Sequence, residues 1–114
     1  MDRRKYNTKG LLHPAYNTKE NVIKISRHEK FEHALAKFLL AYELIHSGQD
    51  VITEAIFQNG KRADVLALQE GVAYEILCSE SKKSILAKAK QYPVEIKPFK
   101  ADQVIKQALK AFLK

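Results

Sequence analysis

Two carboxylates stand inside short apolar runs that have the composition of β-strands. Asp64 lies in RADVLAL (62–68) and Glu75 lies in VAYEILC (72–78). A charged side chain on the packed face of a strand costs several kcal/mol unless it is paired or binds a metal ion. Carboxylate oxygens are also the ligands that hard divalent cations prefer. The two acids therefore predict a shared site in which one cation bridges them.

The connection between the two runs decides whether the acids share a face. It is Gln69-Glu70-Gly71, in which Gly71 can take the positive φ of a tight turn. A two-residue loop puts Asp64 and Glu75 on one face, with Cβ atoms about 4.5–5.5 Å apart if they are directly opposite and about 7–8 Å apart if they are diagonal. A three-residue loop would send them to opposite faces, because side-chain direction alternates along a strand.

Length and composition bound the class of protein. The chain of 114 residues, with 46% hydrophobic and 29% charged residues, is long enough for one modest core. Its apolar runs are far shorter than the roughly 20 residues that span a bilayer, and the N-terminus lacks the apolar stretch of a signal peptide. We therefore expect an intracellular protein without a membrane partner. The single Cys78 excludes an internal disulfide and a zinc site built on cysteines.

Charge is distributed unevenly along the chain. Residues 1–30 carry a net charge of +5, residues 31–78 carry −4 and residues 79–114 carry +6, within a total of +7. A basic protein with a pI near 9.5 favours a polyanionic partner, of which nucleic acid is the usual one. A solvated cationic surface with no partner remains the alternative.

Periodicity predicts an alternation of helices and strands after an extended N-terminal arm (1–26), within which 21–26 can form a short edge strand. Residues 27–114 form a single domain. Its expected elements are a helix over 27–47, strands over 50–57, 62–68 and 72–78, a basic helix over 82–91 capped by Ser81, a strand over 94–99 and a helix over 102–114. This order predicts an α/β (α+β) fold with a mixed four-stranded sheet flanked by helices.

Two further acids lie on these elements. Glu32 borders the packed face of the first predicted helix, where it is either an ordinary polar residue at the edge of an amphipathic helix or a third acid of the site. Glu54 lies inside the first strand, where it either points inward or marks a solvent-facing edge. The pattern does not choose between these alternatives.

The element order and the acids together resemble the PD-(D/E)XK nuclease superfamily, and most of all its competence-associated nuclease-like members. The residues that carry the resemblance are Glu32-His33 with Lys37, GKRADV (60–65) and YEILCS (74–79). It implies an αβββαβα restriction-endonuclease-like core. It further implies Mg²⁺ (or Mn²⁺) held by Asp64 and Glu75, with the Ile76 carbonyl and with Glu32 through water, so that a metal-activated water attacks a phosphodiester.

The chain departs from the family pattern at one position with chemical consequences. The residue two beyond the glutamate is usually Lys, or Gln in the competence-like group, and here it is Leu77. A lysine recruited from elsewhere could replace it. Lys82 and Lys83 at the start of the next helix are candidates, and Lys61 and Arg62 at the mouth of the hairpin are further ones. The other interpretations are a metal-binding protein that cleaves poorly and a noncatalytic descendant.

The resulting hypothesis is a Mg²⁺-dependent DNA endonuclease-like protein with Glu32, Asp64, Glu75 and Lys83 as catalytic residues. Its phosphate-binding residues would be Lys61, Arg62, Lys82, Lys83, Lys88 and Lys90. Because active members of the superfamily often work as dimers, a homodimer is a further expectation. A noncatalytic module that binds nucleic acid or protein is the competing hypothesis. A third is that Asp64 pairs with Arg62 or a lysine only to fix the fold.

Overall fold

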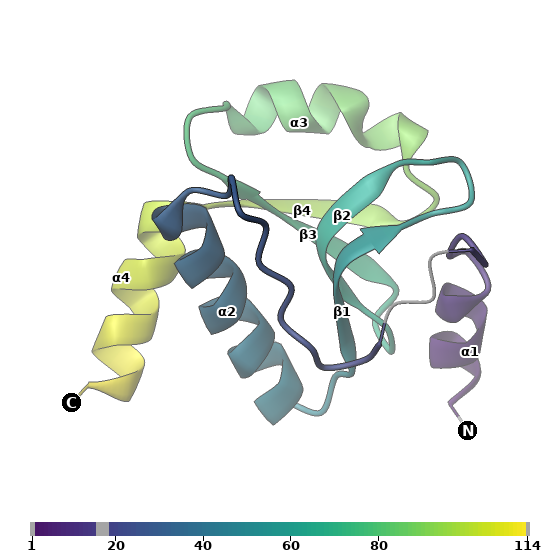
Figure 1. Cartoon of the computed structure of the whole chain (residues 1–114), viewed down its shortest axis with the longest axis horizontal. Coiled ribbons are helices and arrows are strands. Elements are labelled where there is room, and N and C mark those ends of the chain that lie inside the picture. The colour runs from purple at the N-terminus through teal and green to yellow at the C-terminus, as the bar shows by residue number, and fades with distance from the viewer. Residues whose placement is uncertain (1, 16–18, 114) are drawn as a thin grey trace.

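The computed structural model describes residues 2–15 and 19–113, and it contains a four-stranded sheet with the order β1-β2-β3-β4 (Figure 1). β1 to β3 are antiparallel neighbours, and β4 runs parallel to β3 after a helical crossover. The elements are α1 (Arg3–Lys9), α2 (Phe31–His46), β1 (Val51–Ile56), β2 (Arg62–Ala67), β3 (Val72–Leu77), α3 (Lys82–Lys88), the 3₁₀ turn η1 (Ala89–Gln91), β4 (Glu95–Lys100) and α4 (Ala101–Phe112).

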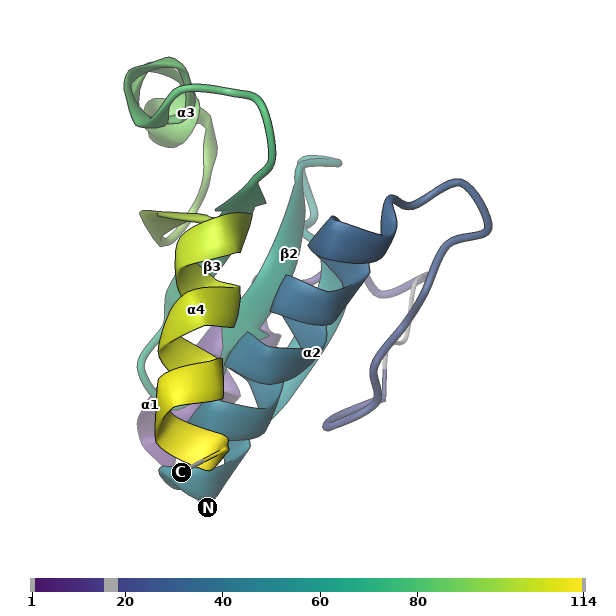
Figure 2. The same ribbon diagram turned by 90° about the vertical axis from the view of Figure 1, so that its left-hand side faces the viewer.

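The predicted fold class is confirmed, since from α2 onward the order is αβββαβα and the sheet is mixed. Each face of the sheet has its own apolar core. Leu40 and Leu44 of α2 pack with Val65 and Tyr74 on one face, and α4 joins them there. On the other face Leu66 and its neighbours pack against α3 and η1. α2 and α4 lie side by side on the outside of the molecule (Figure 2).

The start of α2 differs from the prediction. The helix begins at Phe31 and not at residue 27, and Lys30 at its N-cap makes no capping bond through its side chain. The expected cap, Ser26, instead accepts a long hydrogen bond of 3.4 Å from the His28 N–H within a turn. Glu29 lies in the loop before the helix, and its side chain is tied to Lys37 and His33 of the helix. The Ser81 cap of α3 is confirmed, because its hydroxyl accepts from the Ser84 N–H at 3.1 Å.

The β2–β3 turn is longer than expected but preserves the facing of the acids. Ala67 pairs with Val72, so the loop has four residues, 68–71, with Gly71 at φ +69°. The loop is therefore longer than either of the two lengths weighed from the sequence. Because four is also an even number, it leaves even-numbered positions of β2 opposite odd-numbered positions of β3. The register that joins Val65 to Tyr74 would next join Asp64 to Glu75.

The N-terminal arm contains a helix that the sequence analysis did not predict. α1 is capped by the Asp2 carboxylate, which accepts from the Arg4 N–H at 2.8 Å. The expected edge strand over 21–26 is absent from this described segment. It contacts β1 through separate hydrogen bonds instead. Asn21 donates its N–H to the Val51 carbonyl at 2.7 Å and accepts the Val51 N–H through its side chain at 2.9 Å. The Thr53 hydroxyl accepts the Lys24 N–H and donates to the Val22 carbonyl. Residues 1 and 16–18 of the predicted arm lie outside the described residues.

Among the helices of residues 2–15 and 19–113, none has the length and apolar character needed to cross a membrane.

Candidate functional site

A pocket lies where β2 and β3 part. Their ladder consists of three residue pairs and stops at Val65–Tyr74. Beyond that point the Asp64 Oδ2 atom accepts the Ile76 N–H at 2.8 Å, so a side chain takes the place of a backbone partner. The opening has a volume of about 460 Å³. It is lined by Ser26, His28, Glu29, Lys30, His33, Glu54, Arg62, Asp64, Glu75, Ile76, Leu77, Cys78, Ser79, Glu80 and Ile85.

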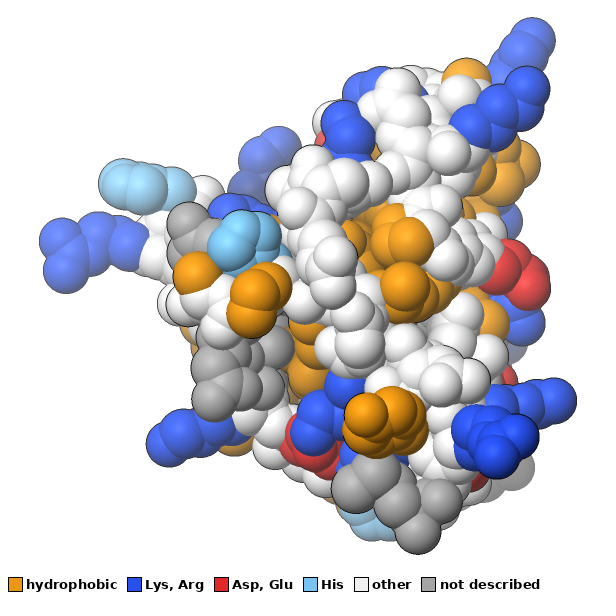
Figure 3. All heavy atoms as spheres, turned by 90° about the vertical axis from the view of Figure 1, so that its right-hand side faces the viewer, with side chains coloured by type: hydrophobic (Ala, Val, Ile, Leu, Met, Phe, Trp, Pro, Cys, Tyr) orange, Lys and Arg blue, Asp and Glu red, His pale blue; other side chains and the backbone are white. Residues whose placement is uncertain are grey.

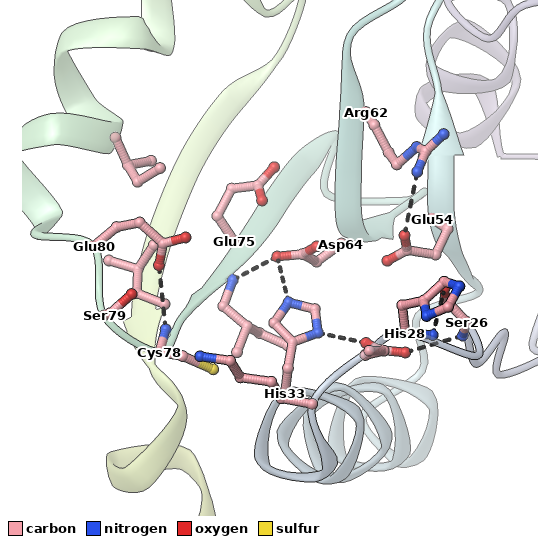
Figure 4. Close-up of a pocket in the computed structure, with 15 residues that line it drawn as sticks. Ser26, His28, His33, Glu54, Arg62, Asp64, Glu75, Cys78, Ser79 and Glu80 are labelled. Carbon is pink, nitrogen blue, oxygen red and sulfur yellow. Dashed lines mark hydrogen bonds and ion pairs between the residues drawn. The ribbon is translucent and has the colours of Figure 1, made fainter.

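The structure brings Asp64 and Glu75 together in this pocket, and Figure 4 shows Asp64 between Glu75 and His33. Burial, the charge of Asp64 and a hydrogen bond with it raise the pKa of Glu75 to about 9. The Glu75 Oε1 atom is buried and has no hydrogen-bond partner. At neutral pH the chain by itself therefore keeps a proton on Glu75, and one of its oxygens has no ligand.

His33 is the cationic neighbour of Asp64. Its Nε2 atom lies 3.4 Å from Asp64 Oδ2, and its Nδ1 atom is paired with Glu29. The hydrogen bond to Asp64 and then that to Glu29 raise the pKa of His33 to about 9, against the effect of burial. Burial acts to raise the pKa of Asp64, but His33, Glu75 and the Ile76 N–H together lower it below its ordinary value. Asp64 is therefore held as a carboxylate.

A fully buried lysine supports the same cluster. Lys37 is 0% exposed, its Nζ lies 2.9 Å from Glu29, and the same atom lies 3.6 Å from Glu54 Oε2. Glu54 points into the pocket from β1, so of the two alternatives left open by the sequence it takes the inward one. Its φ of +53° is unusual for a residue other than glycine. Burial, and then the charge of Asp64, raise the pKa of Glu54 despite the nearby Lys37. Its Oε2 atom is buried without a hydrogen bond.

Two of the predicted catalytic residues are not at this pocket. Glu32 is exposed and lines a separate hollow with Glu80, Ser81 and Asp102 near the start of α4. Lys83 is exposed on α3 and is not among the lining residues. The acid that reaches the pocket here is Glu29, which lies in the loop just before α2. The spacing of Glu29, His33 and Lys37 at four-residue intervals was the signal that could have found it.

The position of the family lysine is apolar. Leu77 is 3% exposed at the end of β3, so no cation of the strand itself serves the pocket. The cationic side chains that line it are His33, Lys30 and Arg62. Arg62 lies 3.9 Å from Glu54, whereas Asp64 is paired with His33, so the expected Asp64–Arg62 pair is not formed.

The other predicted phosphate-binding residues lie on exposed surface. They are Lys61 at the β1–β2 hairpin, Lys82, Lys83 and Lys88 on α3, and Lys90 in η1. On the side of the molecule where α1 lies, Lys and Arg side chains stand around the edge and do not gather in one patch (Figure 3).

Comparison of the chain with protein-family models, curated protein sequences and solved structures found no match. Within residues 2–15 and 19–113, no group of three or more His, Cys, Asp and Glu side chains is placed to hold a metal ion. A cation at the pocket would therefore have two carboxylates, those of Asp64 and Glu75, and would complete its shell with water and backbone oxygen. That donor set fits Mg²⁺, which usually keeps several waters beside one or two carboxylates.

Proposed function

We propose that the protein is a Mg²⁺-dependent endonuclease that hydrolyses phosphodiester bonds of DNA. The observation that supports this most directly is Glu75 Oε1, a buried carboxylate oxygen without a hydrogen bond, in the same pocket as the ionised Asp64. A buried polar atom of this kind is costly unless a group outside the chain, such as an ion, satisfies it. Mn²⁺ would serve the same two ligands.

Asp64 and Glu75 would hold the cation, which makes a bound water more acidic and offsets charge on the attacked phosphate. His33 keeps Asp64 ionised through its Nε2 atom and is itself held by Glu29. Arg62 and Lys30 line the same pocket and carry charges that suit phosphate oxygens. Because these contacts involve the backbone of DNA, binding should depend strongly on salt and little on base sequence.

A noncatalytic nucleic-acid-binding module is the second candidate. Leu77 favours it, because a buried leucine can neither orient a water nor balance charge in a transition state. Lys82 and Lys83 lie outside the pocket lining and do not replace the missing lysine in this arrangement.

Two measurements on the same variants separate the candidates. Supercoiled plasmid and branched DNA are incubated with the native chain, Asp64→Asn and Glu75→Gln in Mg²⁺ or Mn²⁺, and nicking is quantified. Glu95→Gln is the matched control, because Glu95 is an exposed acid on β4 away from the pocket. An endonuclease loses nicking in the two pocket variants and keeps it in the control, while DNA binding persists in all four proteins.

The melting temperature tests the cation separately from cleavage. Mg²⁺ at ten times its Kd should stabilise the native chain by about 1.4 kcal/mol and should stabilise Asp64→Asn much less. A cation effect without nicking, together with salt-sensitive DNA binding, would favour the binding module. No cation effect and no nicking in any form would refute the proposed site.

A further inference from the structure

The outward face of α2 is apolar although the helix lies on the surface. Its sheet-facing side is formed by the buried Ala36, Lys37, Leu40, Ala41 and Leu44. A second series, Phe31, Leu35, Phe38, Tyr42 and Ile45, recurs at alternating steps of four and three residues. At about 100° per residue this series spans an arc of about 80° that is opposite Leu40. A surface helix ordinarily presents polar side chains there.

The apolar face continues onto α4. The ring centroids of Phe38 and Tyr42 are 6.0 Å apart, and those of Tyr42 and Phe112 are 5.4 Å apart in an edge-on contact. Leu109 lies one turn before Phe112. We call Phe31, Phe38, Tyr42, Leu109 and Phe112 the aromatic patch, and these side chains are between 40% and 80% exposed. Figure 2 shows α2 and α4 as an outer layer with no described element in front of them.

We propose that the aromatic patch is the interface of a homodimer in which α2 packs antiparallel against α2 of a second copy. Steps of four and three residues are those by which one helix packs along another. The series is also nearly symmetric about Phe38, because Phe31 and Ile45 each lie seven residues away. Ile45 is half-buried and packs partly against the core of its own copy, so it contributes only its edge to this face. An antiparallel pair centred on Phe38 therefore sets Leu35 of each copy against Tyr42 of the other, as a two-fold interface requires.

Charge within the apolar series does not oppose a second copy. A net charge of +7 on each copy opposes association in general, so a dimer requires an interface that buries no cation. The apolar series of α2 contains no Lys, Arg, Asp or Glu. An acidic partner, by contrast, would be attracted to the lysines elsewhere on the chain and not to this face.

The exposed area sets the expected strength. Aromatic side chains have about 150–250 Å² each, so the patch offers on the order of 500 Å² per copy and about 1,000 Å² in a dimer. This is at the lower end for a specific interface, and we expect a dissociation constant in the micromolar range. The lining of the Asp64 pocket includes no residue of the patch, so we expect the pocket to remain open in the dimer.

Sedimentation velocity from about 1 µM to about 200 µM, which brackets a micromolar Kd, tests the dimer. The native chain should shift from monomer to dimer, whereas Phe31→Ser and Phe38→Glu should stay monomeric. Gln103→Glu makes the same change of charge as Phe38→Glu at an exposed position of α4 outside the patch, and it should dimerise like the native chain. Phe31 is 80% exposed, so its replacement removes little packing within the monomer. Thermal melts verify that each variant folds.

Cross-linking tests the antiparallel geometry. In a Cys78→Ser background, Phe38→Cys lies near the two-fold axis and should form an intermolecular disulfide with oxidised glutathione as the oxidant. Phe31→Cys and Gln103→Cys should not. A native chain that stays monomeric throughout, as it would if a different protein covers the patch, overturns the proposal. So does a dimer that survives both Phe31→Ser and Phe38→Glu, or cross-linking that is equal at all three positions.

Discussion

Replacing Lys37 tests whether the ionic network around the pocket stabilises the fold. The Lys37 side chain is 0% exposed and its partner Glu29 is 8% exposed, so this is a buried ion pair with a distance of 2.9 Å. Lys37→Met keeps an unbranched apolar stem and removes the ammonium. Glu29 then retains only His33 as an ion-pair partner, and Glu54 Oε2 loses the ammonium that lies 3.6 Å away.

The expected loss of folding free energy follows from what happens when only one partner of a buried ion pair is removed. Removing one partner of such a pair typically costs about 3–5 kcal/mol, because the remaining charge is left in a low-dielectric interior. His33 still compensates part of the charge on Glu29, so we expect the lower end, about 3 kcal/mol. For a domain of this size that corresponds to a fall in Tm of about 10 °C.

Urea unfolding at pH 7 measures this loss. Lys106→Met, a change of the same kind at an exposed position of α4, should alter the free energy of unfolding by no more than about 0.5 kcal/mol. The double variant Lys37→Met/Glu29→Gln should recover part of the loss, because it removes the stranded carboxylate. A loss below about 1 kcal/mol in Lys37→Met, or strictly additive losses in the double variant, would refute the network.

Two titrations follow from the same structure. The pKa of His33 is raised to about 9 by Asp64 and that of Glu75 is raised to about 9 by burial and Asp64, from ordinary values of 6.5 and 4.5. Both groups keep protons that the unfolded chain releases, so without a cation the free energy of unfolding should fall as pH rises toward 9. In His33→Gln or Glu75→Gln the urea midpoint should depend less on pH than in the native chain. Asp50 has the opposite sign, because a hydrogen bond from Lys5 leads in lowering its pKa to about 2. Asp50→Asn should therefore destabilise the chain above pH 4 and should have no effect once the pH falls to about 2. Because the Asp50 side chain is 32% exposed, we expect a loss of only about 1 kcal/mol at neutral pH.

Periodicity was sufficient for the order of the longer helices and strands, although the apolar series of α2 lies mainly on its outward face. It failed where local order depends on distant partners. The helix and strand order from α2 to α4 follows from alternating and three-to-four-residue spacings. α1 has seven residues and contains little apolar pattern. It is anchored by Lys5, which lies 2.8 Å from Asp50 and 2.6 Å from Glu20. Those contacts join parts of the chain that no local pattern connects.

The candidate site was predictable in part for the same reason. Asp64 and Glu75 could be placed on one face because side-chain direction has a period of two, and any loop with an even number of residues preserves it. The choice of Glu32 as the acid from α2 depended on which face of that helix packs. The buried side is formed by Ala36, Lys37, Leu40, Ala41 and Leu44, and Glu32 is exposed. With the first turn at Phe31, Glu29 falls in the preceding loop and turns back to Lys37. The different packed face, together with the later start of the helix, thus changed which carboxylate reaches the pocket.

The charges around the pocket explain why we place a cation beside Glu75. Lys37 lies between Glu29 and Glu54, and His33 compensates Asp64. Among the described residues, no ion pair includes Glu75, although it is the carboxyl group whose pKa is raised most clearly by burial and by Asp64. Only a proton or an added cation can compensate Glu75 in this arrangement. If a proton compensates Glu75, the cluster is a structural feature that weakens as pH rises. If a divalent cation does so, the cluster is a site for phosphate chemistry. The response of the melting temperature to Mg²⁺ distinguishes these two alternatives.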